Sequence, residues 1–352
     1  MPASEPIKGR GASVNPTNRF EKIAYEREID WDPQEDPLPR TQIIKDTTQT
    51  IIAYNNSPDV GFDASINVYR GCEHGCAYCF ARPTHEYLGF SPGLDFETKI
   101  VVKEDAPELL RKELSSTKWK PQVLAMSGVT DCYQPLERKM QLTRRCLEVL
   151  AEFRNPTCII TKNFLVTRDA DLLSELAKYN AVAVNVSITT LDSTLQPKLE
   201  PRAATPRARL EAIRILSEAG VNVGVLMAPI IPGLTDHEIV NVIGEAVEAG
   251  AKFAGCVTLR LPFAVKDIFS KWLEDHFPDR KDKVLNKVRS LRDGKLNDPN
   301  FITRMKGSGV FADQISQMFH VACRKAGLKD DRTELSTAHF RRPGGLQMDL
   351  GI

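Results

Sequence analysis

Short apolar, β-branched runs alternate with amphipathic stretches through the middle of the chain, from residue 64 to residue 262. The apolar runs predict six strands, which are SINVYRG (65–71), QVLAMSG (122–128), TCIITKN (157–163), AVAVNVSIT (181–189), VNVGVLMAP (221–229) and FAGCVTLRL (253–261). The stretches between them have helical spacing and predict helices over 106–115, 137–153, 170–179, 206–220 and 236–250. This alternation indicates an α/β fold whose parallel strands are joined by right-handed crossovers.

The two ends of the chain lack this alternation. Residues 1–63 are rich in Pro, Asn, Asp, Glu and Thr, so we interpret them as a mobile or wrapping extension rather than a domain. Residues 263–352 predict a helical appendage and a tail rich in Gly and Pro. Six βα units are fewer than the eight of a closed TIM barrel. The core, 64–262, is therefore expected to form a partial (β/α)6 barrel with its active site at the carboxyl ends of the strands.

Composition restricts the partners of the chain. Lys and Arg total 47 and Asp and Glu total 46, so the formal net charge of +1 provides no global attraction to nucleic acid or to an anionic membrane. There is no run of 18 apolar residues, and the first residues lack the apolar core of a signal peptide. A cytoplasmic protein without a membrane partner is expected.

Three of the eight cysteines, Cys72, Cys76 and Cys79, lie in YRGCEHGCAYCFARP, directly after the first predicted strand. Three thiolates can hold a 4Fe-4S cluster and leave one iron open to a small chelating ligand. Zinc bound by the three cysteines and His74 is the alternative, although four ligands within one short loop differ from the separated pairs of zinc ribbons. The remaining cysteines have no partner at cluster spacing, so we expect one cluster.

This motif, flanked by Tyr78 and Phe80 around the third cysteine in a (β/α)6 pattern, resembles the radical S-adenosylmethionine (SAM) superfamily over residues 64–262. The segments INVYRGCEHGCAYCFARP, TDCYQPLER, ITKN, LEPRAATP and APIIPGLTD are similar to its spore photolyase-related, or DNA repair photolyase-like, group. The resemblance implies that Cys72, Cys76 and Cys79 bind the cluster. It also implies that SAM chelates the open iron and is cleaved reductively to a 5′-deoxyadenosyl radical, with a reductant such as flavodoxin or ferredoxin.

The resemblance also indicates residues that bind SAM. At the end of the second strand, Ser127, Gly128, Thr130 and Asp131 are candidates for the methionine amino group, although the same residues are typical of a capped turn. Four further candidates come from later strands and loops: Lys162, Ser187, Glu200 and Arg202. Met227 is the candidate for an apolar wall against adenine. The alternatives are a solvated lysine, a surface Glu–Arg pair and an ordinary core methionine.

Cys132 is a candidate hydrogen-atom donor to a product radical, with Tyr133 or Tyr78 as relays. A free cysteine is more often a buried apolar residue, but Cys132 lies next to the predicted SAM-binding turn.

Basic residues near the same strand ends suggest two interpretations. They could follow the phosphates of DNA or RNA, or form solvated helix faces; they are Arg138, Lys139, Arg144, Arg145, Arg202, Arg207 and Arg209. The sequence thus predicts a lyase-like radical SAM enzyme acting on a nucleic-acid lesion or base. Radical modification of a protein or tRNA, and a metal-stabilised nucleic-acid-binding module without activity, are the alternatives.

Overall fold

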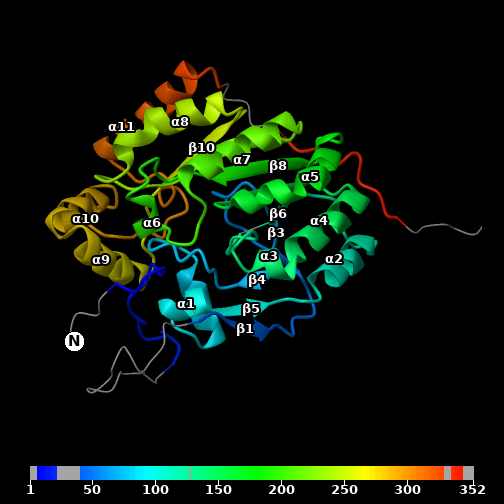
Figure 1. Cartoon of the computed structure of the whole chain (residues 1–352), viewed down its shortest axis with the longest axis horizontal. Coiled ribbons are helices and arrows are strands. Elements are labelled where there is room, and N and C mark those ends of the chain that lie inside the picture. Colours follow the sequence, from blue (N-terminus) through cyan, green and yellow to red (C-terminus); the bar gives the residue numbers. More distant parts are fainter. Residues whose placement is uncertain (1–5, 22–39, 127, 329–333, 344–352) are drawn as a thin grey trace, which may run out of the picture.

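The structure is a computed structural model that describes residues 6–21, 40–126, 128–328 and 334–343. Its main sheet has the order β10-β9-β8-β7-β6-β3-β2 (Figure 1). Six strands are parallel: β3 (Ala64–Ile66), β6 (Leu124–Met126), β7 (Thr157–Thr161), β8 (Val182–Ser187), β9 (Asn222–Ile230) and β10 (Ala254–Thr258). β2 (Ile52–Tyr54) adds an antiparallel strand at one edge. Because β10 and β2 are not paired with each other, the barrel is open, and the predicted partial (β/α)6 barrel is confirmed.

Helices cover the outer face of this sheet: α2 (Ala106–Ser115), α4 (Leu142–Phe153), α5 (Ala170–Ala177), α7 (Pro206–Glu218) and α8 (Ile239–Glu248). Side chains alternate along each strand. In β8, Val182, Val184 and Val186 are buried in the main core with residues of these helices. Asn185 points to the other face, where its amide donates to Cys158 Sγ across β7. Asn185 therefore places a polar side chain on the face of the sheet that the helices do not cover.

The first predicted strand, 65–71, is broken in two. β3 ends at Ile66, and the chain enters a second sheet at β4 (Tyr69–Arg70), which pairs with β5 (Lys99–Val102), itself paired with β1 (Gln42–Lys45). Asn67 explains the break, because its side-chain Oδ1 accepts from Val129 N, at 2.9 Å, where the ladder would otherwise continue. The break directs the following cysteine segment away from the main sheet.

The predicted helix 137–153 is also divided, into α3 (Glu137–Met140) and α4, at Gln141 with φ 53°. The buried carboxylate of Glu137 accepts from Thr143 N at 3.1 Å and so occupies the amino end of α4. An unpaired amide at a helix start needs such an acceptor, which accounts for the break.

The remaining elements surround the two ends of the barrel. They are η1 (Arg82–Leu88), α1 (Leu94–Thr98), η2 (Phe164–Asp169), α6 (Gln196–Leu199), η3 (Asp236–Glu238), α9 (Val265–His276), η4 (Pro278–Arg280), α10 (Lys281–Ser290) and α11 (Val310–Lys325). α11 packs on α8. The tail returns to the barrel, where Arg341 N donates to Phe153 O at 2.9 Å. Within the described ranges, no helix is long and apolar enough to cross a membrane.

Candidate functional site

The cysteine segment forms a buried loop, residues 71–82, which we call the cluster loop. Gly71 and Gly75 have φ values of 83° and 67°, a region that glycine adopts at little cost. Cys72 N donates to Phe96 O at 2.8 Å, and the Gln134 side chain donates to Gly71 O at 3.2 Å and accepts from Glu73 N at 2.9 Å. The loop is therefore fixed from both sides.

Arg82, the last residue of the loop, binds the backbone carbonyls of the cysteine segment. Its buried guanidinium donates to Cys76 O at 2.9 and 3.0 Å and to Gly75 O at 3.3 Å. It also donates to Gly93 O at 2.9 Å and pairs with the buried carboxylate of Glu97 at 2.5 Å. Sequence reasoning missed Arg82, because only the folded chain shows which carbonyls its side chain reaches.

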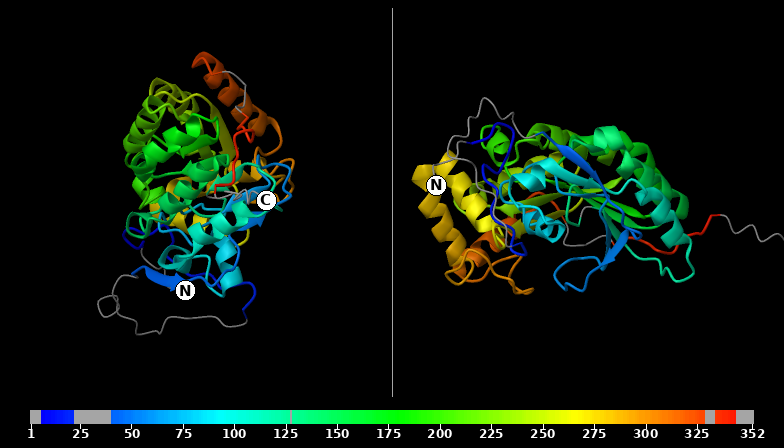
Figure 2. Two further views of the ribbon diagram at one scale, coloured as in Figure 1. Left: turned by 90° about the vertical axis from the view of Figure 1, so that its right-hand side faces the viewer. Right: turned by 90° about the horizontal axis from the view of Figure 1, so that it is seen from below.

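Residues 7–20, which we call the N-terminal strap, lie across the cluster loop. Gly11 N and Ala12 N donate to the Glu97 carboxylate at 3.1 and 2.9 Å. A Cβ on Gly11 would stand 1.7 Å from Gly75 O, so only glycine permits this approach. Ala12 packs with Ile268 of α9, and Figure 2 shows the dark-blue strap beside that helix. Glu97 thus joins the strap to the arginine that holds the loop.

The three loop cysteines gather in one place. Cys79 packs against the hydrophobic cluster that contains Cys72 and against the one that contains Cys76. Burial raises the pKa of Cys76 and of Cys79, so both are thiols until a metal binds and displaces their protons. Three soft sulfur donors suit an iron–sulfur cluster, in which each thiolate binds a different iron. These residues fit that group.

His74 does not complete a mononuclear site. Its Nδ1 lies 3.3 Å from Asp131 Oδ2, and its Nε2 lies 3.1 Å from the Asn163 amide nitrogen. Both ring nitrogens of His74 thus already have partners outside the three cysteines. The arrangement does not support the alternative of zinc bound by three cysteines and His74.

Asp131 connects the cluster loop to the end of β7. Besides His74, its carboxylate accepts from Thr161 Oγ1 at 2.8 Å and from Lys162 N at 2.7 Å. Burial opposes ionisation, but His74 and these hydrogen bonds hold the pKa of Asp131 below its usual value. Lys162 Nζ donates to Ala228 O at 3.3 Å and lies 5.8 Å from the Tyr78 ring centroid, above the barrel interior.

Glu200 is the centre of a second buried network. Its carboxylate pairs with Arg209 and accepts from Tyr78 OH and, at 2.8 Å, from Thr189 Oγ1. Burial opposes ionisation, but Arg209 and Lys162 lower the pKa of Glu200 to about 2. Tyr78, which precedes the third cysteine, is thereby held against Thr189, two residues after β8.

Other predicted SAM residues lie nearby. Thr130 Oγ1 donates to Tyr69 O at 3.0 Å, Gly128 lies against Ser65, and Ser187 ends β8. Arg202 pairs with the buried Glu73 of the cluster loop at 3.1 Å. Ser127 lies outside the described residues.

Three predicted residues are not brought to this place. Met227 is buried in the main core with the helix-facing residues of β9, whereas its half-buried neighbour Ala228 lies on the other face. Cys132 and Tyr133 are buried in the same core, and Tyr133 OH donates to Asp169 at 3.1 Å. Their side chains pack apart from the loop cysteines.

Several of the predicted basic residues already have acidic partners. Arg144 pairs with Asp169 and Asp171, and Arg145 pairs with Glu108. Arg138, Lys139 and Arg207 are exposed. These residues favour the interpretation of solvated helix faces over that of a phosphate-binding row.

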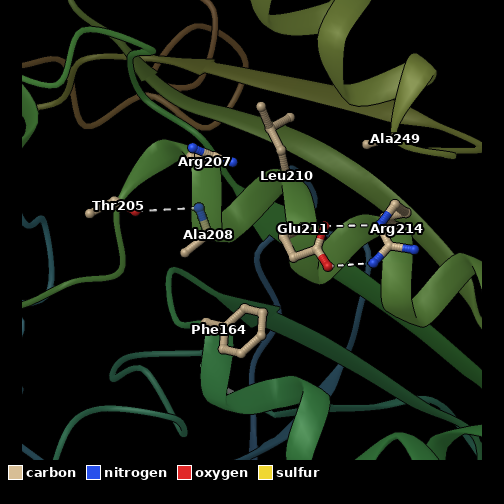
Figure 3. Close-up of a pocket in the computed structure, with 8 residues that line it drawn as sticks. All are labelled: Phe164, Thr205, Arg207, Ala208, Leu210, Glu211, Arg214 and Ala249. Atoms are coloured by element: carbon tan, nitrogen blue, oxygen red, sulfur yellow. Dashed lines mark hydrogen bonds and ion pairs between the residues drawn. The ribbon is translucent and has the colours of Figure 1, made fainter.

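A hollow of about 640 Å³ lies outside the barrel, between η2 and α7 (Figure 3). It is lined by Phe164, Thr205, Arg207 and the paired Glu211 and Arg214, among others. No cysteine or residue of the Asp131 and Glu200 networks lines it, so it is separate from the site.

Comparisons with known proteins agree with this geometry. The model of the radical SAM superfamily matches residues 66–246. An uncharacterised protein of Mycobacterium tuberculosis is 38% identical over 249 residues, which cover 70% of this chain and 72% of the relative. An uncharacterised protein of Methanocaldococcus jannaschii is 31% identical over 227 residues, 64% of this chain and 81% of the relative.

Solved structures of spore photoproduct lyase share the fold. The one complexed with dinucleoside spore photoproduct has a TM-score of 0.58 at 15% identity, over 80% of this chain and 79% of that chain. A mutant of the same enzyme has a TM-score of 0.54, also at 15% identity, over 80% of this chain and 79% of that chain. At this identity the likeness concerns the fold alone. With the family match, the three-cysteine loop and the open parallel barrel, the chain belongs to the radical SAM superfamily, whose enzymes use a 4Fe-4S cluster and SAM.

Proposed function

We propose that this enzyme holds one 4Fe-4S cluster on Cys72, Cys76 and Cys79, cleaves SAM reductively, and acts on a nucleic-acid lesion or base. The observation that carries the first part is the buried cluster loop, in which three thiols gather with no fourth cysteine in the motif. When bound, the cluster and SAM supply an electron and a 5′-deoxyadenosyl radical. The electron comes from a protein such as flavodoxin or ferredoxin.

In this proposal the surrounding residues orient the cofactors. Arg82 fixes the backbone that carries Cys76, and Asp131 positions the loop against β7 through His74. Lys162 is the candidate for the SAM carboxylate, because its ammonium reaches the barrel interior and has only a carbonyl acceptor among the described residues. Gly128, Thr130 and Ser187 border the same space.

Glu200 and Arg202 have supporting roles in the proposal. Glu200 is saturated by Arg209, Tyr78 and Thr189, so it positions Tyr78 rather than binding SAM. Arg202 steadies the cluster loop through Glu73. The proposal gives no role in hydrogen transfer to Cys132 or Tyr133, because both side chains pack in the main core.

A nucleic-acid substrate is supported by the structural neighbour that is complexed with dinucleoside spore photoproduct. Radical modification of a protein or tRNA would use the same cofactors, and products distinguish them. Nucleic-acid repair would convert a modified base, whereas modification of a protein would change the mass of that protein.

The test is anaerobic reconstitution with iron and sulfide, followed by EPR of the reduced protein with and without SAM, and chromatography for 5′-deoxyadenosine. We expect a 4Fe-4S signal that changes when SAM binds, and 5′-deoxyadenosine as a product. The matched controls are Cys76→Ala, which should lose the signal, and Cys158→Ala, which should keep it. Bound zinc without SAM cleavage in the wild type would overturn the proposal.

A further inference from the structure

Five large aromatic side chains are exposed on segments that border the cluster loop and the carboxyl ends of the strands. Phe20, Phe80, Tyr87, Phe263 and Phe301 are between 44% and 73% exposed. Phe80 directly follows Cys79, and Phe263 follows β10. Exposed aromatic rings next to a functional site are typical of interaction sites.

The guanidinium group of an arginine lies over most of these rings. Arg19 lies 3.7 Å from the Phe263 ring centroid and 5.0 Å from that of Phe20. Arg260 lies 5.4 Å from the Phe80 ring centroid. Arg304 lies 4.5 Å from that of Phe301. Phe20 in turn contacts Tyr87, with ring centroids 5.0 Å apart. We call these five rings and three arginines the aromatic–arginine track.

The arginines of the track differ in how their charge is neutralised. Arg19 pairs with Glu86 and Arg304 pairs with Asp59. Arg260 has no carboxylate partner among the described residues; its Nη1 donates to Met305 Sδ at 3.5 Å, and its buried Nε has no acceptor there. Arg260 is therefore the arginine of the track whose charge is not neutralised by a paired carboxylate among the described residues.

The surroundings of Arg260 are positive. Arg304 and Arg292 both act on it with like charge, and Asp59 is the nearby acid. Arg292 is held by neutral acceptors, since it donates to Leu259 O at 2.9 Å and to Thr258 Oγ1 at 3.0 Å. Asp298 acts on Arg292, so three cations face two anions and an excess of one positive charge remains here.

This arrangement costs free energy without a ligand. A partly desolvated guanidinium beside like charges is unfavourable unless an anion approaches it. Burial, with Arg304 and Arg292, lowers the pKa of Arg260 to about 10, so the side chain is still a cation at neutral pH. Phe263 also has a positive φ of 49°, which is unfavourable for a bulky residue. Such strain gathers at functional sites.

We propose that the aromatic–arginine track binds single-stranded nucleic acid, with Arg260 on a backbone phosphate and Phe80 and Phe263 stacked on bases. The inference rests on the nucleic-acid substrate of the proposed function and names the surface that binds it. Aromatic rings stack on any base, and a guanidinium binds phosphate oxygens in pairs. A duplex would keep its bases stacked inside and away from these rings.

The test measures fluorescence anisotropy of labelled oligothymidine and oligouridine, each of about 12 nucleotides, with the reconstituted full-length protein. We expect the wild type to bind, and Arg260→Gln to weaken binding about ten-fold, since one charge-assisted contact is lost. The same variant should lower the slope of log affinity against log salt by about 1. Phe263→Ala should weaken binding roughly five-fold or more, through the loss of one stacked base.

The control is Arg324→Gln, which removes the same charge from the exposed face of α11 and should bind as the wild type does. Arg260→Lys retains the charge without the planar group, so it should keep the salt slope while binding more weakly. Iron content and melting temperature show that each variant is folded. The two oligonucleotides separate DNA from RNA as the source of the phosphate.

Wild-type protein that does not bind either oligonucleotide would overturn the inference, as would equal affinities for the wild type and Arg260→Gln. Binding of an acidic peptide to the track in place of the oligonucleotides would also overturn the inference. These failures differ from failure of the proposed cofactor chemistry, because cleavage of SAM is measured without an oligonucleotide.

Discussion

At the scale of single residues, the chain uses the same pair of charges in two very different ways. Arg82 and Glu97 are completely buried, and between them they hold the cluster loop and the strap. Arg111 and Glu152 form a similar pair on the surface, with side chains 47% and 36% exposed. Because a buried partner that loses its counter-ion has no water to replace it, the two pairs should respond differently to mutation.

Arg82→Met should lower the free energy of unfolding by about 3–5 kcal/mol, because it leaves the Glu97 carboxylate buried without its cation. The reconstituted variant should also release iron to a chelator faster than the wild type. Arg111→Met is the matched control and should cost less than about 1 kcal/mol. Equal effects in urea unfolding would contradict the anchoring role of Arg82.

His85 makes the free energy of unfolding depend on pH. It packs between Phe90 and Phe96, and burial lowers its pKa to about 4, against the opposing charge of Asp95. The folded state therefore keeps His85 neutral below pH 6.5, where the unfolded chain takes up a proton. Its contribution is present above the unfolded pKa and is lost as the pH falls toward 4.

Between pH 7.5 and pH 5, His85 should thus reduce the free energy of unfolding by about 2 kcal/mol. His85→Gln should show a correspondingly flatter dependence of stability on pH over this range. His339→Gln changes an exposed histidine and should keep the wild-type dependence. If the free energy of unfolding depends on pH in the same way in His85→Gln and the wild type, His85 is not the source of this dependence.

At the scale of elements, the strap is the clearest case of a segment whose role depends on one contact. Gly11→Ala places a methyl group against Gly75 O, an overlap that costs about 1–3 kcal/mol and raises the undocked population roughly five- to a hundred-fold. Bleaching of the cluster by oxygen should accelerate as a result. Gly61→Ala, where a Cβ meets nothing within 4 Å, is the control. Equal bleaching rates would mean that the strap does not protect the cluster.

The elements also show what the sequence could predict. The six parallel strands follow from short apolar, β-branched runs, and the helix 106–115 follows from apolar residues at helical spacing. β1 is mostly exposed and β2 has one buried residue, so neither has a clear apolar pattern. The break at Gln141 depends on the Glu137 carboxylate, a contact between side chain and backbone that periodicity does not reveal.

The candidate site divides in the same way. The cysteine spacing is local, so it is visible in the sequence. Arg82 and Glu97 act through contacts with distant backbone atoms, which only the fold specifies. For Met227, alternation shows that it shares a face with Val223 and Val225, but not that this face meets the helices.

At the scale of the whole molecule, different segments pack at the two ends of the barrel. The cluster loop, strap and α9 gather at the carboxyl ends of the strands. The tail binds the opposite side, where Phe340 packs on Phe153 and Arg342 donates to Trp119 O at 2.9 Å. The candidate site and the contact by which the tail covers the core therefore lie at opposite ends of the barrel.

Phe340→Ala should lower the free energy of unfolding by about 2 kcal/mol, because it uncovers part of the main core. The rate of SAM cleavage per bound cluster should stay at the wild-type value. Val310→Ala, at a residue that is 76% exposed, should leave stability unchanged. A loss of cleavage per cluster in Phe340→Ala would show that the tail and the site are coupled.

The position of the strap also bears on how the holoenzyme is assembled in the cell. Gly11 and Ala12 lie some sixty residues before the loop in the chain and are held over it by their hydrogen bonds to Glu97. A carrier that delivers iron and sulfide needs the loop free to open around its cargo. We therefore expect cofactor delivery to precede docking of the strap, so that the strap docks only once the cluster is in place.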